Sequence, residues 1–166
     1  KEQLEILQSI PSLQPVNNPE LDLLVSGFGE RINPFHKGNY QHPGADFAAA
    51  RGTEVFAAAS GKVIDVNRTS LQAGYGNYID IDHGHGFVTR YAHLENISVR
   101  YGQKVTKGVT IGTIGNSGGS IMPHLHYEVI RDGEQVNPTP YMIEGLTSAQ
   151  HHALLKLSVK QNQSLD

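Results

Sequence analysis

Two short stretches of the sequence place histidines beside other side chains that can bind a metal. The first runs from His42 to Asp46 and reads His-Pro-Gly-Ala-Asp, so that an imidazole and a carboxylate lie four residues apart. Pro43 and Gly44 disfavour a helix, and we expect the pair on a loop that enters a strand. A neutral imidazole and one carboxylate suit Zn²⁺. Taken alone, a surface histidine beside an N-capping aspartate explains this motif more simply.

The second stretch is His124-Leu125-His126, inside a run of residues typical of a strand. Residues two apart on a strand point to the same face, about 6.6 Å apart along the chain. Both rings can therefore line one cavity, with one ring binding a metal and the other facing a substrate. Two histidines on a solvated strand face explain the same pattern equally well.

The other histidines carry less information by themselves. Tyr91-Ala92-His93-Leu94 closes a predicted strand, and a single histidine at a strand end is usually structural, so His93 gains weight only from the two motifs above. His83 and His85 flank Gly84, which indicates a turn. The remaining three have no partner pattern: His36, His151 and His152.

Several common catalytic designs are excluded by what the sequence lacks. The chain has no cysteine, which excludes disulfides and thiolate metal ligands. It has no His-Glu-x-x-His, the motif of helix-based zinc proteases. A metal would therefore be held by carboxylates and by some of the nine histidines.

The composition is that of one β-rich domain. The chain has 166 residues, of which 18 are glycine, with a net charge of −3. The sequence has no stripe of Lys and Arg that would indicate nucleic-acid binding, and it has no apolar run long enough to cross a bilayer. The sequence begins with Lys, so we expect any export signal to lie upstream of it.

The pattern of apolar residues and turn residues predicts three segments. Residues 1–23 contain the end of a helix, at Lys1–Ile10, and a linker with Pro11, Pro15 and Pro19. Residues 24–142 alternate strands and turns without βαβ units, which favours an antiparallel sheet. Residues 143–166 form a tail with weak helical periodicity at Thr147–Val159.

The predicted strands and turns within the central segment are as follows. The strands are Val55–Ala59, Lys62–Asn67, Asn77–Asp82, Phe87–His93 and Leu125–Ile130. The turns are at Gly61, Gly74–Gly76 and Gly84–Gly86. Tyr101–Gly112 is predicted to be a hairpin around the Lys107-Gly108 turn.

The motifs together resemble the lysostaphin-like, or LytM-type, zinc peptidases, which are peptidoglycan endopeptidases. The resemblance covers about Ser26 to Tyr141. It is carried by His42-x-x-x-Asp46, by Tyr-x-His-Leu at 91–94 and by His124-x-His126. Framing phrases also match: Ser26-Gly27-Phe28-Gly29 with Arg31 and Pro34, Gly52-Thr53, Gly61-Lys62-Val63, Gly102-x-x-Val105, Gly108, Ile111-Gly112 and Gly115-x-Ser117-Gly118.

The resemblance implies a role for each matching residue. His42, Asp46 and His126 would bind one Zn²⁺ per chain, and His93 and His124 would be catalytic histidines that do not bind it. The implied fold is mainly β, a twisted antiparallel sheet of the lysostaphin-like, duplicated-hybrid type, with the zinc in a groove and short flanking helices. Met122 departs from the family, which often has glycine before the Pro-His-Leu-His run, but no ligand is lost.

The implied function is that of a zinc metallo-endopeptidase. Three protein ligands leave one position open for water, which would attack a peptide carbonyl with two histidines assisting. The expected substrates are peptide stems of peptidoglycan, cut at D-alanyl–diaminopimelate cross-links. The expected location is the bacterial cell envelope, in the periplasm, with an upstream tether and with envelope proteins as regulators.

Three alternatives remain open at this stage. One is a non-catalytic LytM-like module that recruits or activates other wall hydrolases, although all five implied site residues are present. Another is cleavage of glycyl–glycine bonds, as by lysostaphin. The third is a lipoyl- or biotinyl-like barrel, suggested by the Gly102–Ile111 hairpin, in which the paired histidine motifs would have no role.

Overall fold

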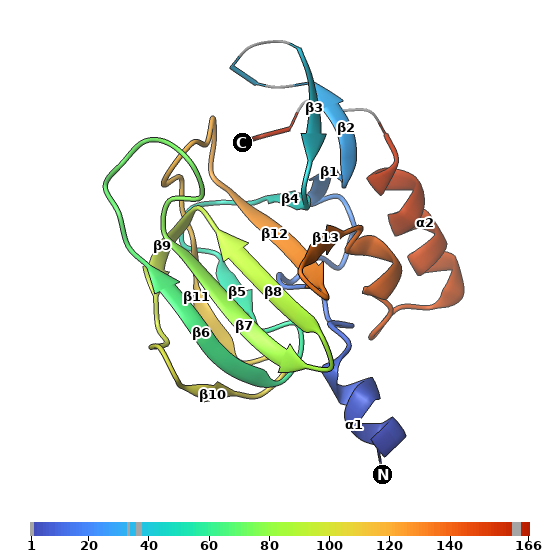
Figure 1. The fold of residues 1–166 in the computed structure, drawn as a ribbon. Helices are drawn as coiled ribbons and strands as arrows, with labels where there is room; N and C mark the ends of the chain where they lie inside the picture. Colours follow the sequence, from blue (N-terminus) through green and yellow to red (C-terminus); the bar gives the residue numbers. More distant parts are fainter. Residues whose placement is uncertain (1, 33, 36–37, 161–163) are drawn as a thin grey trace.

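A large antiparallel sheet forms the centre of the molecule (Figure 1). The computed structural model describes residues 2–32, 34–35, 38–160 and 164–166. In spatial order the sheet contains β1 (Leu24–Ser26), β4 (Ala45–Ala48), β12 (His124–Arg131), β8 (Phe87–Ala92), β7 (Tyr78–Gly84), β6 (Gly61–Asn67) and β10 (Lys104–Val105), and β13 (Glu134–Val136) also pairs with β12.

Two smaller sheets complete the β structure. One has the order β5 (Glu54–Phe56), β11 (Thr110–Ile114) and β9 (Leu94–Ile97), and the other pairs β2 (Gly29–Ile32) with β3 (Asn39–His42). All of these pairs are antiparallel. The mainly β, antiparallel fold predicted from the sequence is confirmed.

Side chains of β12 point alternately into the hydrophobic core and to the opposite face of the sheet. Because side chains alternate along a strand, Leu125, Tyr127 and Val129 point together into the hydrophobic core, where each is fully buried. His124, His126 and Glu128 occupy the positions between them. These three polar side chains are also fully buried, which requires partners for each on their own face.

Helices flank the sheet at both ends of the chain. The short α1 (Glu2–Ser9) precedes the first strand, and the 3₁₀ turn η1 (Thr139–Tyr141) precedes α2 (Ser148–Ser158). A capping box begins α2, in which Thr147 accepts from the backbone of Gln150 and the Gln150 side chain accepts from the backbone of Thr147. Leu154 of α2 lies in the same core as the sheet.

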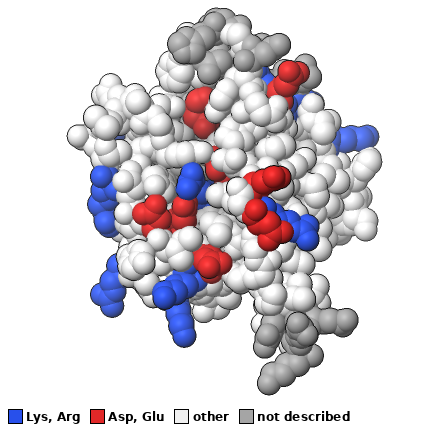
Figure 2. Space-filling view, viewed as in Figure 1, with Lys and Arg blue, Asp and Glu red and all other residues white. Residues whose placement is uncertain are grey.

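The predicted terminal helices agree with the structure, apart from Lys1, which lies outside the described residues. The described residues contain no helix that is long and apolar enough to cross a membrane. Figure 2 shows acidic and basic side chains interspersed on the face seen in Figure 1, with no continuous basic stripe there.

The predicted hairpin at Tyr101–Gly112 is wrong in its pairing. Lys107-Gly108 is a turn, but β10 pairs with β6 whereas β11 pairs with β5 and β9. The backbone around the turn instead bonds to Ala57, which accepts from Gly108 N at 2.9 Å and donates to Val109 O at 3.0 Å. The turn therefore connects two different sheets.

Two further predictions need correction at element ends. Gly61 is the first residue of β6 and does not lie in a turn. Glycine is needed at this position because a Cβ would stand 2.4 Å from the Asp82 carbonyl oxygen of the paired strand. The strand predicted at Val55–Ala59 ends at Phe56. The amide of Ala58 donates to the Tyr91 hydroxyl at 3.0 Å and so leaves the strand ladder.

We expect the central sheet to depend on Ile81 of β7, which is fully buried in the core. Ile81→Ala should lower the free energy of unfolding by about 2–5 kcal/mol, since the lost methyl and methylene groups leave a cavity. Urea denaturation measures this change. Ile64→Ala, on the neighbouring β6 with 39% of the side chain exposed, is the matched control and should change stability little. Equal effects of the two changes would contradict the assignment of the core.

Candidate metal centre

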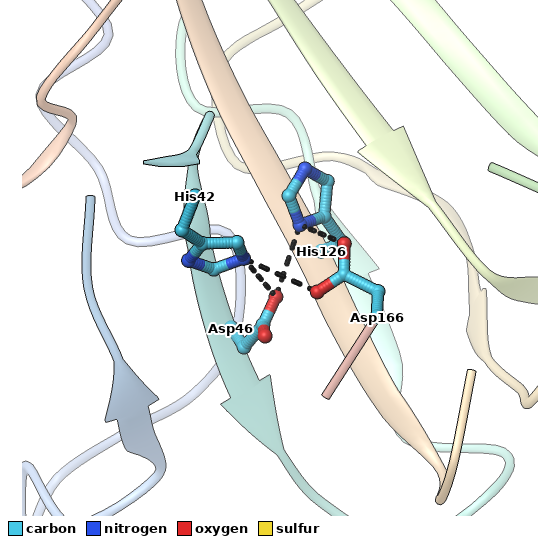
Figure 3. A group of neighbouring side chains, drawn as sticks. All are labelled: His42, Asp46, His126 and Asp166. Atoms are coloured by element: carbon cyan, nitrogen blue, oxygen red, sulfur yellow. Dashed lines mark hydrogen bonds and ion pairs between the residues drawn. The ribbon is translucent and has the colours of Figure 1, made fainter. Parts of the chain in front are cut away.

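Four buried or nearly buried side chains converge at one end of β4 and β12 (Figure 3). His42 Nε2 lies 3.2 Å from Asp46 Oδ1, and His126 Nδ1 lies 3.0 Å from the same oxygen. Asp166 completes the group, with its Oδ1 3.1 Å from His42 Nε2 and its Oδ2 2.7 Å from His126 Nδ1. One ligand atom from each residue lies within 4.8 Å of the others.

The strand pairing places these residues opposite one another. In the antiparallel ladder between β4 and β12, Asp46 is the direct partner of His126. His42 ends β3, and two residues separate it from the start of β4. The glycine at position 44 is required there, because a Cβ would lie 2.2 Å from the carbonyl oxygen of Tyr127. This close approach brings the end of β3 against β12.

The two cluster histidines are oriented by hydrogen bonds at their outer nitrogens. His42 Nδ1–H donates to Gly27 O at 2.8 Å, and His126 Nε2–H donates to Glu128 Oε2 at 2.7 Å. Each bond fixes the tautomer, so the nitrogen facing the cluster carries a lone pair when the ring is neutral. Such outer partners also fix the ring orientation of metal-binding histidines.

His93 and His124 form a second pair beside the cluster. His93 Nδ1–H donates to Ser117 O at 2.6 Å, and His124 Nδ1–H donates to Met122 O at 2.9 Å. Their ring centroids are 4.8 Å apart. The Nε2 atoms of both rings are buried without a hydrogen-bond partner, and they face Asp166 at 3.6 and 3.7 Å.

The backbone at His93 takes an uncommon conformation. Its φ of 62° lies in the left-handed region, which non-glycine residues rarely adopt. The predicted strand through His93 therefore ends at Ala92, and the chain turns there into β9. His93 N donates to Tyr75 O at 2.9 Å, which holds this bend. Strain of this kind concentrates at functional sites.

Met122 contacts the second histidine pair through its backbone. Met122 is 43% exposed, and its backbone oxygen is the acceptor for His124. Met122 therefore contributes through its backbone carbonyl, which any residue at this position would also offer.

The electrostatics of the group favour positive charge between the carboxylates. Burial lowers the pKa of His42, but Asp46 and Asp166 outweigh burial and raise that pKa to about 9. Burial also opposes protonation of His126, yet Asp166 and Asp46 raise its pKa well above the ordinary value. Protonated His42 and His126 would therefore compensate the two adjacent carboxylates, as a metal cation would.

The donor set meets the requirements of zinc. Two imidazole nitrogens and a carboxylate oxygen are ligands that Zn²⁺ takes in catalytic sites. The two unpartnered Nε2 atoms of His93 and His124 face the same space, where a further polar group would satisfy them. A divalent cation would replace the protons that the metal-free cluster holds.

A family comparison bears directly on this geometry. The model of peptidase family M23 matches residues 40–138, more than half of the chain. The chain belongs to peptidase family M23. The predicted resemblance to lysostaphin-like peptidases is thereby confirmed, and the match contains the segments of all five predicted site residues.

Curated relatives of this M23 chain include enzymes and an activator. Peptidoglycan DD-endopeptidase ShyA of Vibrio cholerae is 38% identical over 133 residues, which are 80% of this chain and 30% of ShyA. Murein hydrolase activator EnvC of Escherichia coli is 34% identical over 128 residues, 77% of this chain and 28% of EnvC. The chain thus spans about a third or less of the length of these relatives.

Solved structures of M23 proteins share the fold. A zinc-containing peptidase from Vibrio cholerae superposes with a TM-score of 0.66 at 35% identity, covering 75% of this chain and 38% of that one. The catalytic domain of lysostaphin from Staphylococcus simulans superposes with a TM-score of 0.62 at 28% identity, covering 76% of this chain and 97% of that domain.

The other histidines that the structure describes lie apart from the cluster. His83 is bonded on both sides, to Ser60 O at 2.8 Å and to Thr89 Oγ1 at 2.7 Å. His85 contacts Ser9 Oγ at 2.8 Å. His151 bonds to Thr139 O at 3.1 Å and His152 is exposed on α2, whereas His36 lies outside the described residues.

Sequence reasoning missed two acidic residues of the site. Glu128 continues the two-residue period of His124 and His126, and this spacing could have revealed it. Asp166 has no motif around it, and no local signal connects it with His42.

Glu128 is itself held by several contacts. Tyr75 Oη donates to Glu128 Oε2 at 2.6 Å, and Arg90 Nη1 lies 4.0 Å from Oε1. Burial raises the pKa of Glu128, but the bond from His126 outweighs burial and lowers the pKa below its ordinary value. Glu128 is therefore a fixed carboxylate against the back of the His126 ring.

An open cleft of about 510 Å³ borders the cluster. Its walls are largely aromatic and small side chains, and Asp166 forms part of one side. The lining residues are Phe35, Tyr40, Gln72, Ala73, Gly74, Tyr75, Gly119 and Asp166.

We expect Glu128 to strengthen zinc binding by orienting His126. Glu128→Ala should weaken zinc affinity about 10–100-fold, because the Nε2–H loses its acceptor. Glu128→Gln keeps an acceptor oxygen and should have a smaller effect. Competition with a chromophoric chelator measures the zinc Kd. Glu134→Ala, exposed on the adjacent β13, is the control. A zinc Kd for Glu128→Ala within twofold of the unchanged protein would contradict this role.

Proposed function

We propose that this chain is a zinc metallo-endopeptidase that hydrolyses peptide cross-links of bacterial peptidoglycan. In this proposal His42, Asp46 and His126 bind one zinc ion, and His93 and His124 are catalytic. The observation that carries it is the common orientation of the four rings. Each ring commits its outer nitrogen to an acceptor and turns the other nitrogen to one space.

Zinc would supply Lewis-acid chemistry at this point, lowering the pKa of a water to about 7 and polarising a peptide carbonyl. The protein contributes the placement of proton acceptors. Since Nδ1–H of His93 and of His124 is already donated, each Nε2 can take a proton from the attacking water. A ring protonated in this way can hold negative charge developing on the carbonyl oxygen, or return the proton to the leaving amine.

The substrate assignment rests on the family and on the cleft. ShyA is similar to 80% of this chain, and it is a peptidoglycan DD-endopeptidase. An open cleft walled by Tyr40 and Tyr75 beside the cluster suits an extended peptide stem. We therefore propose cleavage of D-alanyl–diaminopimelate cross-links, with glycyl–glycine bonds as the second candidate because the lysostaphin domain shares the fold.

The main rival is a non-catalytic activator, since EnvC is also similar to this chain. Two observations favour catalysis. The ligand nitrogens of His42 and His126 lie within 3.2 Å of Asp46, and the unpartnered nitrogens of His93 and His124 face the same space. A purely structural module would gain nothing from buried polar atoms without partners.

The same proposal covers location and organisation. A chain that acts on peptidoglycan works in the cell envelope, and we propose the periplasm, a tether supplied by sequence upstream, and regulation by envelope proteins. Residues 24–142 would form the catalytic unit, flanked by residues 1–23 and 143–166. The relatives' greater length leaves room for further segments.

Removal of one proposed ligand should remove the metal. His42→Ala removes one of the proposed imidazole ligands, so we expect loss of zinc after dialysis against a chelator and loss of activity on cross-linked peptidoglycan. Elemental analysis measures the metal content. His152→Ala, on the exposed side of α2, should keep both. Full zinc occupancy in His42→Ala would show that the ligand set is wrong.

Removal of either catalytic histidine should leave the metal in place. His93→Ala and His124→Ala should each retain one zinc and lower kcat about 10²–10⁴-fold, the usual contribution of a positioned acid or base. Steady-state kinetics and metal content on the same samples separate the two effects. Normal turnover in either variant would exclude that histidine from the chemistry, and lost zinc would make it a ligand.

Defined substrates distinguish the scissile bond. A muropeptide dimer joined by D-alanyl–diaminopimelate should be cut to monomers, whereas a pentaglycine-bridged dimer should remain intact. Mass analysis of the products identifies the bond. The reverse preference would support the glycyl–glycine alternative, and no cleavage of either dimer, by the zinc-loaded protein and also by its Asp166→Asn variant, would support an activator.

A further inference from the structure

The C-terminal segment Ser164–Asp166 is built into the candidate site. Leu165 N donates to Asp46 Oδ2 at 2.9 Å, and Ile121 N donates to Leu165 O at 3.0 Å. Ser164 is fully buried and Leu165 is 9% exposed. Backbone bonds on both sides and burial of two successive residues hold the segment against the cluster.

The Asp166 carboxylate lies between the proposed ligands and the proposed catalytic histidines. Its Oδ1 is 3.1 Å from His42 Nε2 and 3.7 Å from His124 Nε2. Its Oδ2 is 2.7 Å from His126 Nδ1 and 3.6 Å from His93 Nε2. The carboxylate therefore faces all four inward nitrogens, in the space where a scissile carbonyl and an attacking water would have to lie.

We propose that Asp166 is a fourth, intramolecular zinc ligand and that the segment Ser164–Asp166 thereby closes the space between the ligands and the catalytic histidines until it is displaced. This inference rests on the proposed function, because it assigns regulation of the same site. Carboxylate oxygen is a normal zinc ligand, and structural zinc sites are closed by four protein ligands whereas catalytic ones keep one position open. Displacement of Asp166 would convert the first kind of site into the second.

Charge supports the ligand assignment. Asp46 and Asp166 both approach within hydrogen-bond distance of the same two histidine nitrogens, so two carboxylates share one buried space. Two buried carboxylates this close are costly unless a proton or a cation compensates their charge. A divalent ion bound by both carboxylates would compensate their charges.

Tethering makes the block effective. A ligand attached to the same chain competes with substrate at a high effective concentration. If Asp166 is displaced in only about 0.1–10% of molecules, the apparent affinity for substrate is the intrinsic affinity multiplied by that fraction. Weakening the segment should therefore raise kcat/KM by about tenfold or more, without any change in the catalytic histidines.

The decisive variant is Asp166→Asn, which keeps the size of the side chain but removes its charge. Asp22→Asn, in an exposed turn, is the matched control. We expect Asp166→Asn to bind zinc more weakly in chelator competition, to change the visible absorption spectrum of the Co²⁺-substituted protein, and to raise kcat/KM on a muropeptide dimer about tenfold or more. Leu165→Ala keeps the carboxylate but loses apolar burial, and it should raise kcat/KM as well.

Each outcome decides the matter. Unchanged zinc Kd and Co²⁺ spectrum in Asp166→Asn would show that Asp166 is not a ligand, and unchanged or lower kcat/KM would overturn the block. Failure of the proposed function looks different. In that case neither the unchanged protein nor the variant cleaves a dimer, yet the zinc Kd and the Co²⁺ spectrum still report whether Asp166 binds the metal.

Discussion

The register between β4 and β12 is the constraint on which the site depends. It places Asp46 directly opposite His126, and His124 opposite Ala48, on the face of β12 away from the core. A slip of one residue would send Leu125 and Tyr127 into the site and the histidines into the core. The fully buried side chains of Leu125 and Tyr127 oppose such a slip, so hydrophobic packing on one face sets the arrangement of the His and Asp cluster on the other.

Hydrogen bonds at the outer nitrogens fix the tautomer and the orientation of each of the four histidine rings. Backbone oxygens of Gly27, Ser117 and Met122 accept from His42, His93 and His124, whereas His126 donates to a carboxylate, that of Glu128. Backbone acceptors are available whatever residue occupies the position. This explains how Met122 can replace a glycine without disturbing His124, and it makes Glu128 the sensitive member of the outer layer.

The sequence predicted the parts of this molecule that are local. The four-residue spacing from His42 to Asp46 and the strand period of His124 and His126 are visible without a structure, and these residues do lie together. The hairpin around Lys107-Gly108 was wrong because a turn does not determine which strands its two ends pair with. The bend at His93, with a φ of 62°, also depends on contacts distant in the sequence.

Asp166 was beyond prediction for a related reason. It lies 124 residues from His42 in the sequence, and its position follows from bonds that Leu165 makes to Asp46 and Ile121. Glu128 was within reach, since it continues the period of β12, but an acidic residue on a strand has no distinctive spacing until its histidine partner is placed. Long-range pairing therefore added both acidic residues to a site whose histidines were already recognisable.

Anomalous diffraction at the zinc absorption edge tests the central claim most directly. Crystals of the unchanged protein grown with zinc should show one strong peak per chain, about 2.0–2.2 Å from His42 Nε2, His126 Nδ1 and an Asp46 oxygen. The Nε2 atoms of His93 and His124 should lie outside bonding distance of that peak. A peak at another set of residues, or none at full zinc saturation, would contradict the account.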